Sequence, residues 1–143
     1  MNPLPSPRAE LAGCCWLPRF VAKARQWQDG KLSAEYAARF CDHDSVDDHF
    51  LRFFEWSGAG LVDAAIRLRV DAELAAWFCA QSGIDAARIA AWNELAENPG
   101  RPGFPMAARL AEVLPGAYRH LDPAGVDSIF ALLEADERPA GGK

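Results

Sequence analysis

The chain has 143 residues, half of them hydrophobic and 24% charged, with a formal net charge of −5 at neutral pH. This balance is typical of one folded domain and excludes a disordered chain. The acidic net charge disfavours a protein that binds the nucleic-acid backbone, and the longest apolar run, residues 11–17, is too short to span a bilayer. We therefore predict no nucleic-acid partner and no membrane association.

The charges are distributed unevenly along the chain. Residues 1–40 contain six Lys or Arg against three Asp or Glu, whereas the remainder contains nine against seventeen. Either the basic segment steers an anionic partner, or it packs on the acidic part of the same chain. We favour the second interpretation, because charges on solvated faces rarely decide function.

The N-terminal third is predicted to contain two helices. Residues 1–5 form a flexible, Pro-rich lead, and a short helix is predicted from Pro7 to Gly13. The main N-terminal helix is predicted from Pro18 to Asp29, because proline suits the first helical turn and a glycine follows as a stop. Its apolar face repeats at helical spacing and contains Leu17, Phe20, Val21, Ala24 and Trp27.

Further short helices are predicted downstream. They cover residues 46–56, 61–69 after a break at 57–60, a segment capped by Asp71, a segment capped by Asp85, then 105–114 and 122–137. No segment alternates with period two over five or more residues, and β-branched residues are scarce. We predict an all-α fold, a compact single-domain bundle of about seven short helices over residues 6–137, with a flexible tail at 138–143.

Four cysteines, Cys14, Cys15, Cys41 and Cys79, show no C-x-x-C spacing. Reduced thiols and a cytoplasmic location are therefore predicted. Cys14 and Cys15 lie near arginines in the sequence, which could lower a thiol pKa. The favoured interpretation is that they are small apolar side chains packed in a turn.

The strongest candidate site is a cationic cluster near the N-terminus, made of Arg8, Arg19, Lys23 and Arg25. Arg19 and Lys23 stand four residues apart on one helical face, where like charges repel. That repulsion predicts an anion or a carboxylate nearby. Two alternatives stay open: a small anionic ligand bound by the cations, or pairing of Arg19 and Lys23 with Asp or Glu from later helices.

A second candidate is the densest group of possible metal ligands, which comprises Cys41, Asp42, His43, Asp44, Asp47, Asp48 and His49. Zinc accepts such side chains, but structural sites draw a second ligand pair from a distant segment, and none is evident. The acidic residues also suit the start of a helix that Ser45 caps. We predict a capped helix, no metal and no cofactor.

The same segments resemble the signature of an uncharacterised bacterial family, domain of unknown function five-zero-six-nine. Its pattern opens with S-P-R-x-x-L-x-G, continues with L-P-R-x-x-D-K-A-R and includes a later D-x-x-F-L-x-F stretch. Matching positions are Ser6, Pro7, Arg8, Leu11, Gly13, Leu17, Pro18, Arg19, Lys23, Ala24, Arg25, Asp47 or Asp48, Phe50, Leu51 and Phe53. Ala22 stands where the family usually has Asp. The resemblance covers nearly the whole chain and implies its extent and fold class, but no activity.

Two functional hypotheses follow from the sequence. The first is a non-enzymatic binding or interaction module, able to self-associate, that holds a small anionic ligand at the cationic cluster. The second is a small enzyme that acts on an anionic metabolite, with His43, His49 or Cys41 supplying the chemistry beside the same cations. The sequence leaves open whether the protein is an enzyme, and we favour the first hypothesis.

Overall fold

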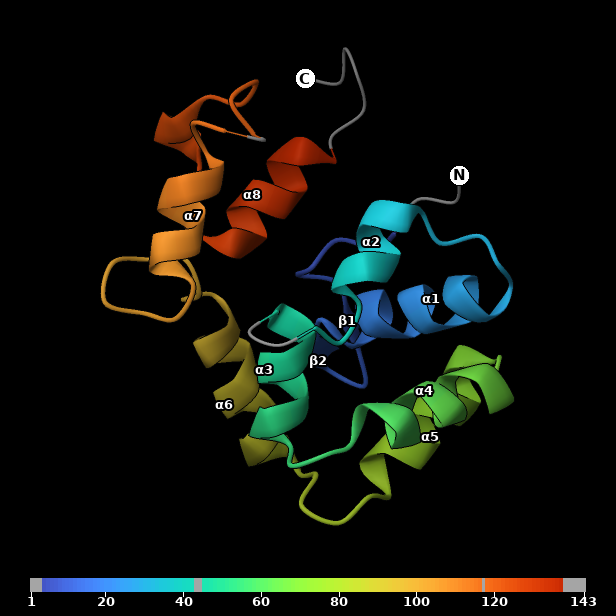
Figure 1. Ribbon diagram of the computed structural model, residues 1–143. Coiled ribbons are helices and arrows are strands. Elements are labelled where there is room, and N and C mark those ends of the chain that lie inside the picture. The colour runs from blue at the N-terminus through green and yellow to red at the C-terminus, as the bar shows by residue number, and fades with distance from the viewer. Residues whose placement is uncertain (1–3, 43–44, 117, 138–143) are drawn as a thin grey trace. The chain divides into compact units, whose positions relative to one another are not determined.

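A computed structural model describes residues 4–42, 45–116 and 118–137 (Figure 1). These residues form eight α-helices, one short 3-10 helix and one pair of two-residue strands. The prediction of an all-α fold with about seven short helices is therefore confirmed. The chain divides into two compact units, residues 1–93 and residues 94–143. No helix in the described ranges is long and apolar enough to cross a membrane.

The first unit contains the strand pair and most of the helices. Its elements are β1 (Glu10–Leu11), β2 (Cys14–Cys15), α1 (Leu17–Gln28), α2 (Ala34–Arg39), α3 (Val46–Phe53), α4 (Gly58–Arg67), α5 (Asp71–Cys79) and the greater part of α6 (Ala86–Ala96). Helix α1 packs beside α4 (Figure 1). The contact between α1 and α4 places the cation-bearing helix beside the C-terminal half of the first unit's sequence.

The segment between Pro7 and Gly13 is not helical, so the prediction of a short helix there is wrong. It forms a turn and one arm of an antiparallel hairpin in which Leu11 pairs with Cys14. Ala12 and Gly13, at the hairpin tip, both have positive φ angles, 55° and 78°. Such angles fit a tight two-residue hairpin turn, whose twist matches that of the strands.

Three helix starts also differ from their predictions. Asp71 was expected to cap a helix, but it is the first residue of α5, and Val70 occupies the N-cap position. Residues 57–60 were expected to separate two helices. Instead α4 begins at Gly58, because Ser57 Oγ accepts a hydrogen bond from Gly60 N (3.1 Å) and caps the helix. Near the C-terminus, Asp122 caps only a three-residue 3-10 helix, Pro123–Gly125. The final helix α8 (Ile129–Asp136) begins later, where Ser128 Oγ accepts from Ala131 N (3.2 Å).

A chain of aromatic rings forms the core of the first unit. The rings of Phe20 on α1 and Phe50 on α3 lie 5.9 Å apart, and Phe50 lies 5.1 Å from Trp92 on α6. Phe54 extends this core to Phe78 on α5, with ring centroids 5.9 Å apart. Large aromatic contacts of this kind dominate the burial energy of small domains, so α1, α3, α5 and α6 are joined through one interior.

Trp27 was expected to belong to this apolar face, and that prediction is wrong. Its side chain is 52% exposed, although it continues the helical spacing of Phe20 and Ala24. Those two residues are fully buried, whereas Trp27 lies in the last turn of α1. Helical periodicity gives the direction of a side chain and does not show where the neighbouring elements end.

The second unit contains the end of α6, the helix α7 (Ala107–Val113), the 3-10 helix and α8. Its loop at Gly100 is tightly built: Gly100 N donates to Pro105 O (2.7 Å), and Ile129 N donates to Pro99 O (2.8 Å). Gly100 has φ +95°, and a Cβ there would lie 2.9 Å from Ile129 N. Only glycine fits this position without a backbone shift.

We expect Gly100→Ala to destabilise the protein by more than a left-handed backbone alone costs. Gly103→Ala is the matched control, because Gly103 has φ +86° and a Cβ added there would meet no atom within 4 Å. The control should cost about 1–2 kcal/mol for the backbone conformation, and Gly100→Ala about 1–3 kcal/mol more for the clash. Urea unfolding measures both. Equal losses would show that the close approach to Ile129 is absent.

Candidate functional site

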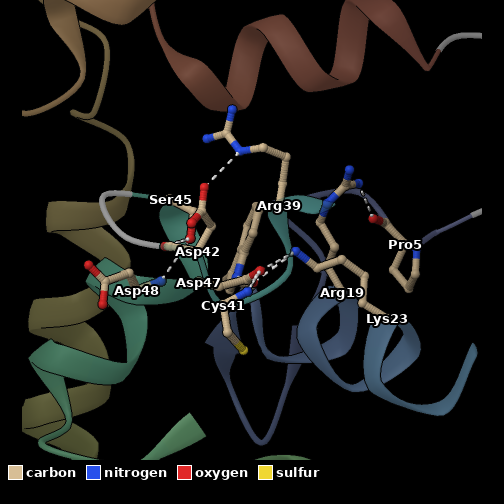
Figure 2. A network of polar contacts seen from close by, with 10 residues as sticks. Pro5, Arg19, Lys23, Arg39, Cys41, Asp42, Ser45, Asp47 and Asp48 are labelled. Atoms are coloured by element: carbon tan, nitrogen blue, oxygen red, sulfur yellow. Dashed lines mark hydrogen bonds and ion pairs between the residues drawn. The ribbon is translucent and has the colours of Figure 1, made fainter. Parts of the chain in front are cut away.

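A buried carboxylate, that of Asp47, accepts hydrogen bonds within the network of polar residues that Figure 2 shows. Ser45 caps α3 by accepting from Asp48 N (3.2 Å), which fixes the first turn of the helix and the place of Asp47 in it. Asp47 is 1% exposed. Its Oδ1 accepts from Trp16 Nε1 (2.9 Å) and its Oδ2 from Cys41 N (3.1 Å).

Lys23 of α1 is the cationic partner of this carboxylate. Its Nζ lies 2.8 Å from Asp47 Oδ1 and 2.7 Å from Oδ2, and the residue is 6% exposed. The ammonium also lies 4.7 Å from the centre of the Trp16 ring and 5.6 Å from that of Phe40. Burial lowers the pKa of Lys23, and the charge of Asp47 opposes that shift. The pair joins α1 to α3.

Arg19 stands one turn before Lys23 and is 1% exposed. Its Nη1 donates to Pro5 O (3.0 Å), and its guanidinium lies 5.5 Å from the centre of the Trp16 ring and 5.6 Å from that of Tyr36. Arg19 also lowers the pKa of Lys23 by charge repulsion. The two cations predicted to share a helical face do so, and both lie near the Trp16 ring, whose face attracts cations.

Arg25 points to a different neighbour, the C-terminal end of α4. Its Nε donates to Ala65 O (3.1 Å), its Nη2 to Leu68 O (2.7 Å), and its Nη1 to Asp71 Oδ1 (3.0 Å). A guanidinium at this position satisfies carbonyls that a helix end leaves without partners and complements the helix dipole. Arg25 therefore holds α1 against α4 and the start of α5.

Arg8 is exposed and lies in the turn that precedes the hairpin. Its backbone N donates to Ser6 Oγ (3.1 Å). Two further hydrogen bonds attach this turn to the start of α1, from Trp16 N to Pro7 O (3.1 Å) and from Arg19 to Pro5 O. The turn that carries Arg8 is thereby fixed beside the helix turn that carries Arg19.

The alternative that Arg19 and Lys23 pair with carboxylates of later helices is present for Lys23, and Arg25, which that alternative did not include, also has a carboxylate partner. Lys23 pairs with Asp47 of α3, and Arg25 pairs with Asp71 of α5. A ligand role for Arg8, Arg19, Lys23 and Arg25 stays a prediction. The structure adds Trp16, which the sequence did not single out, and Asp47, which the sequence offered only as a possible metal ligand or part of a helix start. Asp47 occupies the acidic position of the D-x-x-F-L-x-F stretch, and that was the available signal.

The residues proposed for an enzymatic alternative have unfavourable surroundings. Burial raises the pKa of the Cys41 thiol to about 12, with the charge of Asp47 adding to the shift. A thiol that stays protonated at neutral pH is a weak nucleophile. His49 lies on α3, and within the described part of the chain its Nε2 makes no hydrogen bond. His43 lies outside the described residues.

Cys14 and Cys15 are buried at the second strand of the hairpin. Burial raises the pKa of Cys14 well above its ordinary value. These environments fit small packed side chains and not reactive thiols. Of the candidate metal ligands around Cys41, Asp44 also lies outside the described residues. The residues that are described bring together no group of three or more metal-ligating side chains.

We expect stability to fall as the pH rises from 9 to 12, in part because Cys41 ionises in the unfolded chain near 9.0 but in the folded chain only near 12. The unfolded state then loses its proton first, which favours unfolding by up to about 1.4 kcal/mol per pH unit for one thiol. Urea unfolding over this pH range should give a smaller decline for Cys41→Ser than for the native chain. An identical decline would contradict a partly buried Cys41 thiol that stays protonated in the folded chain.

The fold and the polar core describe a small helical protein in which a buried lysine–aspartate pair joins the first long helix, α1, to α3. The model of the family described as domain of unknown function DUF5069 matches residues 1–139. The chain therefore belongs to this family, as the N-terminal resemblance implied. No curated protein and no solved structure is significantly similar to the chain.

Proposed function

We propose that this chain is a non-enzymatic binding module that holds a small anionic ligand at its N-terminal corner, the surface formed by the Arg8 turn and the start of α1. Arg8 is the exposed contact, and the buried Arg19 adds its charge. The observation that carries the proposal is the pair of hydrogen bonds that fixes the Arg8 turn to the start of α1. A cation on a fixed turn loses less conformational entropy on binding than one on a mobile segment. In this proposal Lys23 and Arg25 fix α1 to the neighbouring helices and add positive charge to the region of the ligand.

The preference for binding over catalysis rests on the candidate nucleophile. Cys41 is hydrogen-bonded to the buried pair through its backbone N and Asp47 Oδ2, and the raised pKa of its thiol disfavours thiolate chemistry. The placement of Arg8 on a turn fixed beside that of Arg19, by contrast, favours carboxylate or phosphate groups. A cytoplasmic location and self-association stay predictions of the same proposal.

Binding is tested by calorimetric titration of the full chain with pyrophosphate and with citrate at constant ionic strength. Matching the salt matters, because multivalent anions also stabilise proteins by exclusion from the surface. We expect saturable binding that weakens as sodium chloride screens the charges. Arg8→Ala should weaken it severalfold without loss of the fold, since Arg8 is exposed.

Arg67→Ala is the matched control, because Arg67 is an exposed arginine on α4 whose only described ion pair is with Asp63 (3.5 Å). It should leave anion binding unchanged. The proposal is wrong if neither anion binds saturably, or if the Arg67 and Arg8 variants lose affinity equally.

A further inference from the structure

A cleft of about 460 Å³ lies in the first unit, and none of the four cations of the N-terminal cluster is among its lining residues. The hairpin tip, the end of α5 and the first turns of α6 line it. Its apolar wall is formed by Ala12, Ile84, Ala86, Ile89 and Ala90. A volume of this size falls within the range of small-molecule sites, which are largely apolar with a few polar groups.

The walls of the cleft are held in place by hydrogen bonds between distant segments. Asn93 Oδ1 accepts from Cys15 N (2.9 Å), and Asn93 Nδ2 donates to Gly13 O (2.8 Å). Trp92 Nε1 donates to Cys15 O (2.9 Å). Three bonds therefore fix the hairpin to α6, so the cleft is formed before a ligand arrives and binding costs little reorganisation.

The charge of the cleft differs in sign from that of the N-terminal corner. Asp85 is the one ionisable carboxylate among its lining residues, and no Lys or Arg lines it within the described part of the chain. Asp85 Oδ1 accepts from Arg88 N (2.7 Å) and so caps α6. Its Oδ2 makes no hydrogen bond within the described residues and is able to accept one from a ligand at the rim.

We propose that this cleft binds a small apolar molecule that carries an ammonium group, with the apolar part against Ile89 and Ala90 and the ammonium at Asp85. The apolar wall supplies burial, and the single carboxylate supplies the preference for a cation over an anion. The site goes beyond the proposed anion site and takes a ligand of opposite charge.

The test uses nuclear magnetic resonance titration of the full chain with phenethylammonium, 2-phenylethanol and 3-phenylpropionate as probes. We expect saturable shifts of the Gly13, Ala86 and Ala90 amides with phenethylammonium, and severalfold weaker binding of 3-phenylpropionate. Occupancy should also slow the modification of Cys79, an exposed thiol in the wall of the cleft, by N-ethylmaleimide.

Two variants and one control variant locate the site. Asp85→Asn keeps a good helix cap and should weaken phenethylammonium binding severalfold while leaving 2-phenylethanol binding unchanged. Ala90→Phe fills the cleft and should abolish binding of both, whereas Ala91→Phe, at an exposed alanine of the same helix that does not line the cleft, should not. Equal binding of all three probes, no saturable shift, or equal effects of the two phenylalanine variants would each overturn the proposal. None of these outcomes bears on the anion site.

Discussion

Asp47→Ala is expected to lower the free energy of unfolding by about 3–5 kcal/mol, because it leaves the ammonium of Lys23 buried without its counter-charge. Asp47 also accepts hydrogen bonds from Trp16 Nε1 and Cys41 N. A loss of this size is a large part of the total stability of a small domain. Urea unfolding measures it, and Asp47→Asn, which keeps the shape of the side chain, provides a milder variant if the alanine variant does not fold.

The cost should come from the unpaired charge and not from the loss of attraction alone. The double variant Lys23→Met, Asp47→Leu removes both charges and should recover much of the loss, except for about 1–3 kcal/mol from the donors of Trp16 and Cys41. Asp63→Ala breaks an exposed pair on α4 with Arg67 and should cost less than about 1 kcal/mol. A double variant as unstable as the sum of its single variants would contradict a buried pair.

Trp92→Ala is expected to lower the free energy of unfolding by about 3–5 kcal/mol. Removal of a fully packed tryptophan leaves a cavity that the neighbouring side chains fill only in part. Trp92 is 1% exposed, and its ring meets those of Phe50, Phe53 and Phe54. Its Nε1 also holds the hairpin through Cys15 O. Thermal unfolding or urea unfolding checks the loss, and Trp92→Phe should recover most of the packing but not the hydrogen bond.

Trp27→Ala is the matched control for this prediction. Trp27 is half exposed in the last turn of α1, so its removal should change stability by less than about 1 kcal/mol. Similar losses for the two tryptophan variants would mean that the ring contacts of Trp92 do not form the core of the first unit.

Helix starts were predictable from the sequence where a capping side chain bonds to the backbone of the same turn. The start of α3 at Ser45 and the start of α6 at Asp85 follow from capping side chains that reach three residues ahead. The hairpin was missed because Ala12, a good helix former, adopts a positive φ there. The pairing of Leu11 with Cys14 and the bonds to Asn93 outweigh that local preference.

The candidate site was predictable in part. Arg19 and Lys23 share a helical face because four residues make slightly more than one turn, whereas Arg25 stands about 200° around the helix from Lys23. The helical spacing therefore explains why Arg25 points to α4, on another side of α1 from Arg19 and Lys23. The choice of Asp47 as partner was not predictable, because it depends on how α1 and α3 pack over twenty-four residues of separation.

The most direct test of the buried pair is the pH titration of the lysine side chains by nuclear magnetic resonance. The chain has three lysines, Lys23, Lys31 and Lys143, so their Cε signals are few enough to assign with Lys23→Met. We expect the pKa of Lys23 to lie below 10.5, the ordinary value of a lysine side chain, and to fall further in Asp47→Asn, because that variant removes the charge that opposes the effect of burial. A Lys23 that titrates at the ordinary lysine value of 10.5, unchanged by Asp47→Asn, would contradict a lysine held inside the protein by this carboxylate.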